Sequence, residues 1–243
     1  TAPSVSSITV SGSPATNATS VSFTVNFSEN VSGVDATDFT VDGSGVTGNI
    51  TGMSGSGATY TVSVGSISGT GTISIDLKSS GTGIQDGSGN VISGGFTSGA
   101  THTVDTEAPT TPGAPDLVAA FDSGTSNTDN ITSVTQPRFS GIGIEAGVTI
   151  KITSSINGLV GTTTTNVGGS YSYIITGTLS EGTHNITVTA TDGAGNESSS
   201  SAALSVVVDT SAPTLSSSSP TDDATGVSPG GNITLTFNEN IAF

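Results

Sequence analysis

The chain has no cysteine and no tryptophan, and only three of its 243 residues are lysine or arginine. Without cysteine it forms neither a disulfide nor a thiolate metal site. Its 19 acidic residues give a formal net charge of −16. A nucleic-acid partner is therefore excluded, because neutralising phosphates requires a basic face. An anionic membrane surface is excluded on the same ground.

Long apolar runs are also missing from the sequence. No apolar stretch approaches the roughly 20 residues that a membrane-spanning helix needs, so we expect no membrane insertion in this segment. Charged residues make up only 9 % of the chain, a low value that, with abundant glycine and serine, superficially resembles a disordered composition. The apolar residues nevertheless alternate in short runs, and this pattern predicts folded strands.

What the sequence does contain is a pair of stretches that occurs twice. DGSGN at 86–90 is followed by VDTEAPT at 104–110, and DGAGN at 192–196 is followed by VDTSAPT at 208–214. A third Ala-Pro opens the chain, and the three Ala-Pro pairs are about 105 residues apart, which indicates a modular array. We predict module 1 at 1–106, module 2 at 107–210 and the start of an incomplete module 3 at 211–243. Each Asp-Thr-x-Ala-Pro is a predicted joint between modules.

The apolar pattern within each module predicts strands. Val21, Phe23, Val25 and Phe27 alternate strictly with polar residues and should lie on one face of a strand. Seven strand-like runs occur in module 1, at 5–10, 21–27, 39–41, 46–51, 60–64, 73–77 and 101–104. Seven also occur in module 2, at 117–120, 138–142, 148–152, 158–164, 171–175, 184–190 and 204–208. With no helical period, this predicts an all-β chain of tandem immunoglobulin-like antiparallel β-sandwich modules.

Module 3 begins as a sister of module 1. FNEN at 237–240 parallels FSEN at 27–30. An isolated strand pair is marginal in water, so the apolar face of Ile233, Leu235 and Phe237 must be covered. Either further residues of the module or strands donated by a neighbouring chain, as in a polymer, would cover it.

Several of these stretches resemble a known family. The sequence GIGIEAGVTI at 141–150, with EGTHNITVTATDGAGN at 181–196, is similar to the bacterial Ig-like repeat of giant surface adhesins and biofilm-matrix proteins. FSENVSGVDATDFTV at 27–41 resembles a sister repeat of the same proteins. The resemblance implies secretion to the bacterial cell surface, extended tandem arrays and calcium at the joints.

The motifs that suggest catalysis or ligand binding are weak. The Gly-x-Ser-x-Gly at 226–230 lacks the strand, helix and nearby histidine that a nucleophile elbow requires. His102 and His184 fall in predicted strands of different modules, so we do not expect an enzyme. Sugar-binding sandwiches usually present exposed aromatics, whereas Tyr171 and Tyr173 are predicted to be core residues.

The acidic residues carry the strongest indication of a site. Both Asp-Gly-x-Gly-Asn stretches predict tight turns, and their oxygens also suit Ca²⁺, which takes six to eight oxygen ligands. An EF-hand is excluded because the twelfth positions, Thr97 and Ala203, are not glutamate. In a seven-strand sandwich the last loop returns to the entrance of its module. The sequence therefore predicts calcium sites at the joints rather than within a helical motif.

Three groups of candidate ligands follow from this topology. Asp105, Glu107, Asp192 and Asn196 are expected at the joint between modules 1 and 2. Asp122, Asp129 and Asp209 are expected at the exit of module 2. Asp86 and Asn90 should face the joint before Thr1. Clustered acids repel unless a cation binds them, so the alternative to calcium is a solvated acidic patch.

Three functions stay open at this point. The first is a structural spacer of an extracellular bacterial adhesin or matrix protein, with neighbouring modules of the same chain as its partners. The second is a module that itself binds a glycan or a host or matrix protein. A third possibility is a subunit of an extracellular filament joined to other copies by strand donation. A large exposed aromatic or apolar patch would favour binding over spacing.

Overall fold

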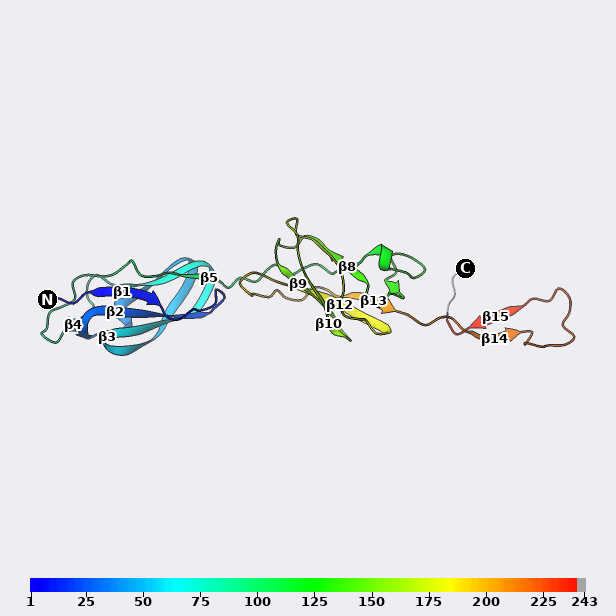
Figure 1. Cartoon of the computed structure of the whole chain (residues 1–243), viewed down its shortest axis with the longest axis horizontal. Coiled ribbons are helices and arrows are strands. Elements are labelled where there is room, and N and C mark those ends of the chain that lie inside the picture. Colours follow the sequence, from blue (N-terminus) through cyan, green and yellow to red (C-terminus); the bar gives the residue numbers. More distant parts are fainter. Residues whose placement is uncertain (240–243) are drawn as a thin grey trace. The chain divides into compact units, whose positions relative to one another are not determined.

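The computed structural model describes residues 1–239, and their regular secondary structure is almost entirely β-strand (Figure 1). Within this part, the helical elements are two three-residue 3-10 turns, η1 (Ala36–Asp38) and η2 (Ala119–Phe121). The predicted all-β class is therefore confirmed. No helix of the described part is long and apolar enough to cross a membrane.

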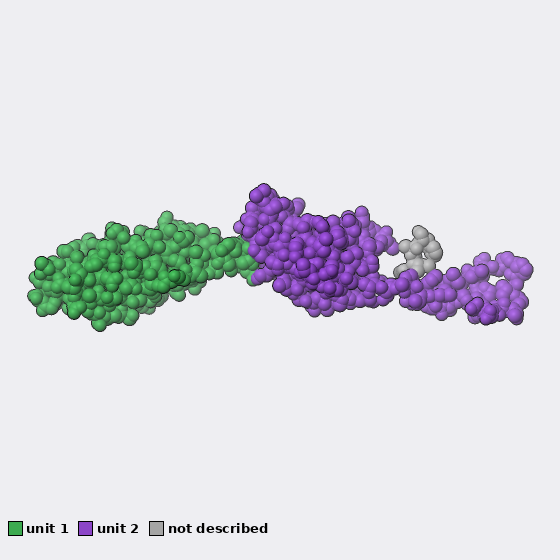
Figure 2. Space-filling view, viewed as in Figure 1, with its two compact units in different colours: residues 1–109, 191–197 green, residues 110–190, 198–243 purple. Residues whose placement is uncertain are grey.

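The chain divides into two compact units (Figure 2). Unit 1 comprises Thr1–Pro109 together with Thr191–Glu197. Unit 2 comprises Thr110–Ala190 and Ser198–Phe243. The boundary after Pro109 falls close to the predicted module boundary at 106. The short segment Thr191–Glu197, which the repeat assigns to module 2, groups instead with unit 1.

Module 1 is organised around β2. Its strands are β1 (Val5–Val10), β2 (Ser20–Ser32), β3 (Phe39–Leu77), β4 (Gln85–Asp86) and β5 (His102–Asp105). They pair in the order β1-β2-β3-β5, and β4 also pairs with β2. Phe23 of β2 lies opposite Val10 of β1 and Val62 of β3, and both pairings are antiparallel. The alternation predicted for this strand is confirmed, because Val21, Phe23, Val25 and Phe27 are all buried.

The long strand β3 differs from expectation. The sequence predicts four separate runs between 39 and 77, whereas the structure forms one continuous 39-residue strand. Glycines explain the difference, because they bend the chain without ending its hydrogen bonding. A Cβ at Gly71 would lie 1.9 Å from the carbonyl oxygen of Ser44, and Gly71 has a φ of +153°. Two parts of β3 thus approach each other so closely that only glycine fits.

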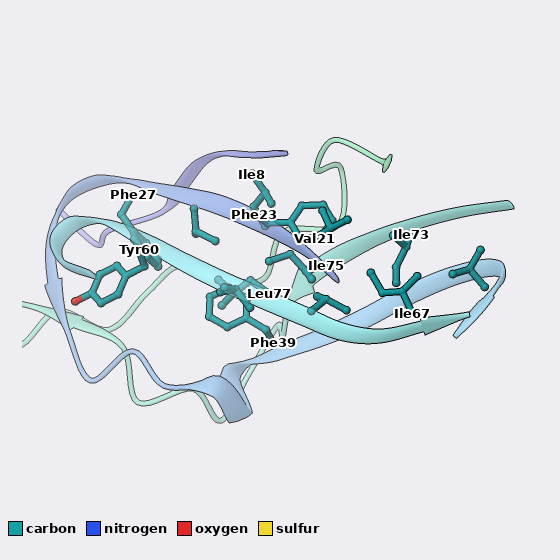
Figure 3. Packing of buried hydrophobic residues seen from close by; sticks show 14 of the residues in the cluster. Ile8, Val21, Phe23, Phe27, Phe39, Tyr60, Ile67, Ile73, Ile75 and Leu77 are labelled. Carbon is teal, nitrogen blue, oxygen red and sulfur yellow. The ribbon is translucent and has the colours of Figure 1, made fainter. Parts of the chain in front are cut away.

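The core of module 1 is formed by side chains from β1, β2 and both halves of β3. Figure 3 shows Phe23, Ile75 and Leu77 among them, and all three are buried. The Phe27 and Tyr60 rings meet edge to face, with 5.7 Å between centroids. The Tyr60 hydroxyl donates to the carbonyl oxygen of Val31 at 3.1 Å, which satisfies its buried polar atom.

Module 2 forms two sheets packed into a sandwich. The first sheet has the strand order β10-β9-β12-β13-β7, and the second has the order β11-β8-β6. The strands are β6 (Asp116–Leu117), β7 (Ile131–Thr132), β8 (Arg138–Gly141), β9 (Thr149–Ser154), β10 (Gly158–Thr164), β11 (Tyr171–Ile174), β12 (Gly182–Thr191) and β13 (Leu204–Val208). Phe139, Ile150, Ile152, Ile186 and Val206 are fully buried in its core.

Two features of module 2 were not predicted. The strand expected at 117–120 ends at Leu117, because Phe121 donates its backbone N–H to the carbonyl oxygen of Val118 at 2.7 Å and closes the turn η2. The second is β7, whose Ile131 and Thr132 pair in parallel with Val207 and Val208 of β13. A two-residue strand carries too little pattern to be read from sequence.

Module 3 contributes a hairpin of β14 (Leu215–Ser219) and β15 (Thr234–Phe237). Leu215 pairs with Phe237, and the register shifts after this pair. Val5 and Phe27 pair in the same way at the start of module 1, with the same kind of shift. The parallel between modules 1 and 3 is thus visible in the backbone; Asn240 of the repeated motif lies outside the described residues.

Candidate functional site

The loop at 192–196 is a closed hydrogen-bonded turn. Oδ1 of Asp192 accepts the backbone N–H groups of Ala194, Gly195 and Asn196 at 2.7–2.9 Å. Oδ2 of Asp192 accepts Nδ2 of Asn196 at 2.9 Å. Gly195 has a φ of +96°, which explains the glycine at this position. The predicted tight turn is therefore present.

The loop at 86–90 repeats this arrangement. Oδ1 of Asp86 accepts the backbone N–H groups of Ser88 and Asn90, and Oδ2 accepts Nδ2 of Asn90 at 2.7 Å. The side-chain bond from Asn90, with the backbone N–H bonds, holds the pKa of Asp86 below its ordinary value. Burial pushes the pKa of Asp192 upward, but the bonds from Asn196, Gly195 and Ala194 outweigh it and keep that pKa lowered. Both loops thus hold an ionised aspartate at their centre.

Asn196 has one contact that Asn90 lacks. Its Nδ2 also donates to the backbone carbonyl oxygen of Asp105 at 2.9 Å. Asp105 ends β5 of module 1, and Asn196 follows β12 of module 2, so residues 91 positions apart are joined by one amide. The structure thus brings together three of the residues predicted for this joint, Asp105, Asp192 and Asn196. The contact that joins them is a hydrogen bond to a main-chain oxygen.

The first residues of each joint are fixed to the module that precedes them. Oδ1 of Asp105 accepts the hydroxyl of Thr70 at 2.9 Å and the backbone N–H of Glu107 at 3.3 Å. The hydroxyl of Thr106 accepts the backbone N–H of Gly69 at 2.9 Å. The carboxylate of Asp105 is thus turned toward its own module and its own turn.

The joint after module 2 has the same local turn. Oδ1 of Asp209 accepts the backbone N–H of Ser211 at 3.1 Å, just as Asp105 accepts that of Glu107. The carboxylate of Glu181 accepts the hydroxyls of Thr210 and Ser211, each at 2.8 Å. These two bonds hold the pKa of Glu181 below its ordinary value. Glu181 therefore fixes the exit of module 2.

A second glutamate fixes the entrance of module 2. Oε1 of Glu145 accepts the backbone N–H of Thr110 at 2.9 Å. Sequence reasoning missed both Glu145 and Glu181. Each is a single acidic residue just before or after a strand, and nothing in its local sequence says which distant residue it meets. The repeated joint motif was the only signal in the sequence, and it marks the segments that the glutamates bind rather than the glutamates themselves.

Two further predicted residues, Asp122 and Asp129, lie in the loop between η2 and β7. Oδ2 of Asp122 accepts the backbone N–H of Asn130 at 3.1 Å. Oδ1 of Asp129 accepts the backbone N–H of Ile131 at 3.1 Å, and Oδ2 accepts that of Ser126 at 3.0 Å. Asp209 was expected to join them, but its carboxylate serves the turn at Ser211 described above.

The residues predicted to bind calcium do not gather into groups of three acids. Within residues 1–239, no three His, Asp or Glu side chains are grouped as a metal would require. The three-acid clusters expected from Asp105, Glu107 and Asp192, and from Asp122, Asp129 and Asp209, are therefore not formed. At Asp192 the carboxylate oxygens are met by N–H donors, so the contacts there are complete without a cation. Calcium at this joint stays a prediction.

The two histidines are structural. His184 is fully buried in β12; its Nε2 meets the carbonyl oxygen of Ser180 at 2.7 Å, and its Nδ1 meets the hydroxyl of Ser154 at 2.8 Å. Because the carbonyl must accept, Nε2 carries the proton and Nδ1 accepts from Ser154. His102 is buried in β5, with Nε2 at 3.2 Å from the carbonyl oxygen of Ala15. Neither imidazole is placed to reach a substrate.

Two family models, each described as a bacterial Ig-like domain, match residues 108–210 and 209–243. No curated relative matches the chain. Among solved structures, the chain is similar to a biofilm associated protein BSP domain (21% identity, 86% of this chain and 30% of that one, TM-score 0.29). It is also similar to the N-terminal part of the bacterial S-layer protein SbsC, with 15% identity over 86% of this chain and 44% of that one and a TM-score of 0.30. A third similar structure is a tetra-tandem repeat in the extending region of a large adhesion protein, with 20% identity over 88% of this chain and 53% of that one and a TM-score of 0.32.

The chain spans less than two thirds of the length of each of these three solved chains. The two family models carry the assignment of residues 108–243, because both describe the same kind of module. The β-sandwich of module 2 agrees with them. Residues 108–243 therefore belong to bacterial Ig-like domains.

Proposed function

We propose that the chain is a structural spacer of an extracellular bacterial adhesin or matrix protein, in which Ig-like modules are held in series by hydrogen bonds at their ends. The observation that carries this proposal is the bond from Nδ2 of Asn196 to the carbonyl oxygen of Asp105. It ties a loop of one module to the last strand of the preceding module. Glu145 and Glu181 hold the connecting segments at the two ends of module 2.

The distribution of aromatic residues supports a spacer over a glycan-binding module. Every phenylalanine and tyrosine within residues 1–239 is buried or half-buried, including Tyr171 and Tyr173. Among the described residues of module 1, one large apolar side chain is exposed, that of Val91. In module 2 the exposed apolar side chains are single residues at strand ends and turns, such as Ile142, Ile156 and Val167. Scattered apolar residues of this kind are ordinary on protein surfaces.

The spacer proposal includes no catalytic activity. His102 and His184 are buried with hydrogen-bond partners. Ser228, the serine of the Gly-x-Ser-x-Gly stretch, accepts the backbone N–H of Gly231 through its own carbonyl oxygen and sits in a turn rather than between a strand and a helix. These contacts give each residue a structural role.

The spacer proposal is tested by small-angle X-ray scattering of the full chain. Asn196→Ala removes the bond to Asp105 and the bond to Asp192, whereas Asn90→Ala removes only the matching bond to Asp86. We expect Asn196→Ala to broaden the distance distribution and Asn90→Ala to leave it unchanged. Equal curves for all three proteins would contradict the proposed role of the Asn196 contact.

Calcium-stiffened joints form a separable part of this proposal. The same scattering experiment, repeated in CaCl₂ and in chelator, measures whether the ion changes the distribution of the wild-type chain. A change that Asp105→Asn or Glu107→Gln abolishes would support calcium at the joint. An unchanged curve would show that calcium does not stiffen the joint, and it would not contradict the proposed role of the hydrogen bonds there.

A second candidate function, assembly with other copies, rests on the hairpin of module 3. Leu215, Val227, Ile233 and Leu235 are exposed on this hairpin and line one hollow. Analytical ultracentrifugation of the full chain over a range of concentrations tests it. A concentration-dependent polymer that Leu235→Ser dissolves would favour the filament, and a monomer throughout would favour the spacer.

A further inference from the structure

The chain contains one Asn-Gly pair, Asn157-Gly158, and it lies at the tip of a hairpin. Residues 155–157 form the turn between β9 and β10, and they are exposed together with Gly158. In an Asn-Gly pair the backbone nitrogen of the glycine can attack the side-chain amide carbon of the asparagine. A side chain on the second residue hinders this attack, and glycine has none. The pair is therefore a candidate site of chemical self-modification.

The side-chain carbonyl of Asn157 is held by two donors from another loop. Its Oδ1 accepts the backbone N–H of Ser180 at 3.1 Å and the hydroxyl of Ser180 at 3.4 Å. Donors on a carbonyl oxygen stabilise the negative charge that the oxygen gains when a nucleophile adds to its carbon. Ser180 is therefore placed at Asn157 as the donors of an oxyanion hole are placed in an acyl-transfer enzyme.

Both sides of this contact are fixed by His184, which is fully buried. Its Nε2 lies 2.7 Å from the carbonyl oxygen of Ser180, and its Nδ1 lies 2.8 Å from the hydroxyl oxygen of Ser154. The hydroxyl of Ser154 also accepts the backbone N–H of Asn157 at 3.2 Å. A closed ring of hydrogen bonds thus holds Ser180 against the side chain of Asn157.

The backbone nitrogen of Gly158 lies where the hairpin opens most easily. Gly158 pairs with Ser154 at the end of the β9–β10 ladder, and the register shifts after the next pair. β10 is also the edge strand of its sheet. Terminal pairs of this kind open at little cost in free energy. Apart from its two chain neighbours, no described residue places an atom within 4 Å of a Cβ built at Gly158, so the nitrogen has room to move.

We propose that Asn157 is a self-modification site, which the chain converts to aspartate and isoaspartate through a cyclic imide formed with Gly158. Hydroxide removes the proton from the backbone nitrogen of Gly158, and this nitrogen forms a bond to Cγ of Asn157. The electron pair of the carbonyl moves to Oδ1, which accepts the two hydrogen bonds from Ser180. When the pair returns, the bond from Cγ to Nδ2 breaks, and Nδ2 takes a proton from water and leaves as ammonia.

Water then opens the imide at one of its two carbonyl carbons. Cleavage of the new bond between Cγ and the nitrogen of Gly158 restores the ordinary backbone and gives aspartate at position 157. Cleavage of the original peptide bond leaves the chain connected through the side chain and gives isoaspartate. The net reaction consumes one water and releases one ammonia, so it needs no oxidant or reductant.

The two products affect module 2 differently. Aspartate keeps a side-chain oxygen for Ser180 and adds one negative charge at the hairpin tip. Isoaspartate adds one methylene group to the backbone between residues 157 and 158, so the turn no longer matches the ladder and the contact with Ser180 is lost. The hairpin tip would thus record the age of the chain. The inference does not depend on the spacer role.

The direct test is incubation of the full 243-residue chain at mildly alkaline pH, followed by pepsin digestion and mass spectrometry. We expect Asn157 to gain the mass difference between an amide and a carboxylic acid, at a rate that rises with hydroxide concentration. Asn30 and Asn49 are internal controls, because they are exposed but precede valine and isoleucine. If Asn157 changes no faster than these two, the proposal is overturned.

Variants of the partners test the role of the contact. Asn157→Gln requires a larger ring and should stop the reaction. Ser180→Ala removes the hydroxyl and keeps the backbone N–H, so the reaction should slow about two- to fivefold, because the lost bond is the longer of the two. Ser180→Thr keeps a hydroxyl and should restore the rate. Ser155→Ala removes a hydroxyl that binds the backbone N–H of Asn185 instead, and should leave the rate unchanged.

The effect of Ser180 on the chemistry is separable from an effect on the turn. A slower Ser180→Ala chain with an unchanged melting temperature and an unchanged ratio of aspartate to isoaspartate would place the effect on formation of the imide. A Ser180→Ala chain that reacts faster than the wild type would show that the contact protects Asn157, and would overturn the role assigned to Ser180. If a variant fails to fold, the peptide map of the wild type still decides whether Asn157 is the site.

Discussion

Nδ2 of Asn196 lies 2.9 Å from the backbone carbonyl oxygen of Asp105 and 2.9 Å from Oδ2 of Asp192. One amide thus uses both of its N–H groups, one to close its own loop and one to hold the end of β5. Asn90 occupies the same position in the first loop but donates only to Asp86. The two asparagines therefore form a natural pair of test and control.

The first prediction concerns the mobility of the connecting segment. Asn196→Ala should increase the motion of residues 105–110, because the carbonyl of Asp105 loses its amide partner. It should also reduce stability by about 0.5–1.5 kcal/mol more than Asn90→Ala, the usual contribution of one hydrogen bond. ¹⁵N relaxation and calorimetry measure the two effects. Unchanged relaxation at 105–110 in Asn196→Ala would show that the contact does not hold the segment.

The second prediction is that the two cores unfold separately. Phe23 and Ile150 are fully buried in different clusters. Phe23→Ala should destabilise module 1 by roughly 3–5 kcal/mol, and Ile150→Ala should destabilise module 2 by roughly 2–5 kcal/mol. Calorimetry should resolve the loss in one module at a time. An equal loss in both modules for either variant would mean that they fold as one unit.

The third prediction tests the structural role of His184. The hydroxyl of Ser154 accepts the backbone N–H groups of Ile156 and Asn157 at 3.2 Å and donates to Nδ1 of His184. Ser154→Ala should cost about 1–3 kcal/mol, because it leaves buried polar groups without partners. Ser155→Ala removes one exposed bond to the backbone N–H of Asn185 and should cost less. Urea denaturation compares the two, and equal midpoints would rule out the buried network.

The fourth prediction is a loss of stability at high pH. Burial, together with the negative charge of Asp116, raises the pKa of Tyr171 to about 12. Between the ordinary pKa of tyrosine, near 10, and this value, the unfolded chain releases the phenol proton while the folded chain keeps it. Stability is therefore complete below pH 10 and falls as pH rises from about 10 to 12. Tyr171→Phe should lose less stability over this range, and an equal loss would assign the effect elsewhere.

The fifth prediction concerns low pH at the first loop. The hydrogen bonds from Asn90 and Ser88 lower the pKa of Asp86, so the folded state favours its ionised form. This stabilisation is present above the ordinary aspartate pKa and is lost as pH falls through the lowered value. Asn90→Ala should raise the pKa of Asp86, which a carboxyl-carbon NMR titration measures. An unchanged value would mean that the side-chain bond from Asn90 contributes nothing.

Much of this architecture was readable from the sequence. The alternation at Val21–Phe27 predicted the inward face of β2, because a strand places every second side chain on the same side. The repeated Asp-Gly-x-Gly-Asn predicted its turns, because glycine at the fourth position accepts a positive φ and aspartate accepts backbone N–H groups of its own loop. The period of the Ala-Pro pairs predicted the modular array. Strand alternation and turn motifs are local properties, so the chemistry of neighbouring residues is enough to predict them.

Only the tertiary structure decided which distant groups meet. Nothing local distinguishes Glu181, which holds Thr210 and Ser211, from an acid facing solvent. The expected three-acid clusters are missing because Asp105 and Asp209 turn toward their own backbone. The contact of Asn196 with Asp105, and the burial of Oδ1 of Asp122 without a hydrogen-bond partner, depend on where the neighbouring strands end in space. A shift of these strand ends by one hydrogen-bond length would change both. Strand pattern fixes which face a side chain occupies, but packing fixes which atom it reaches.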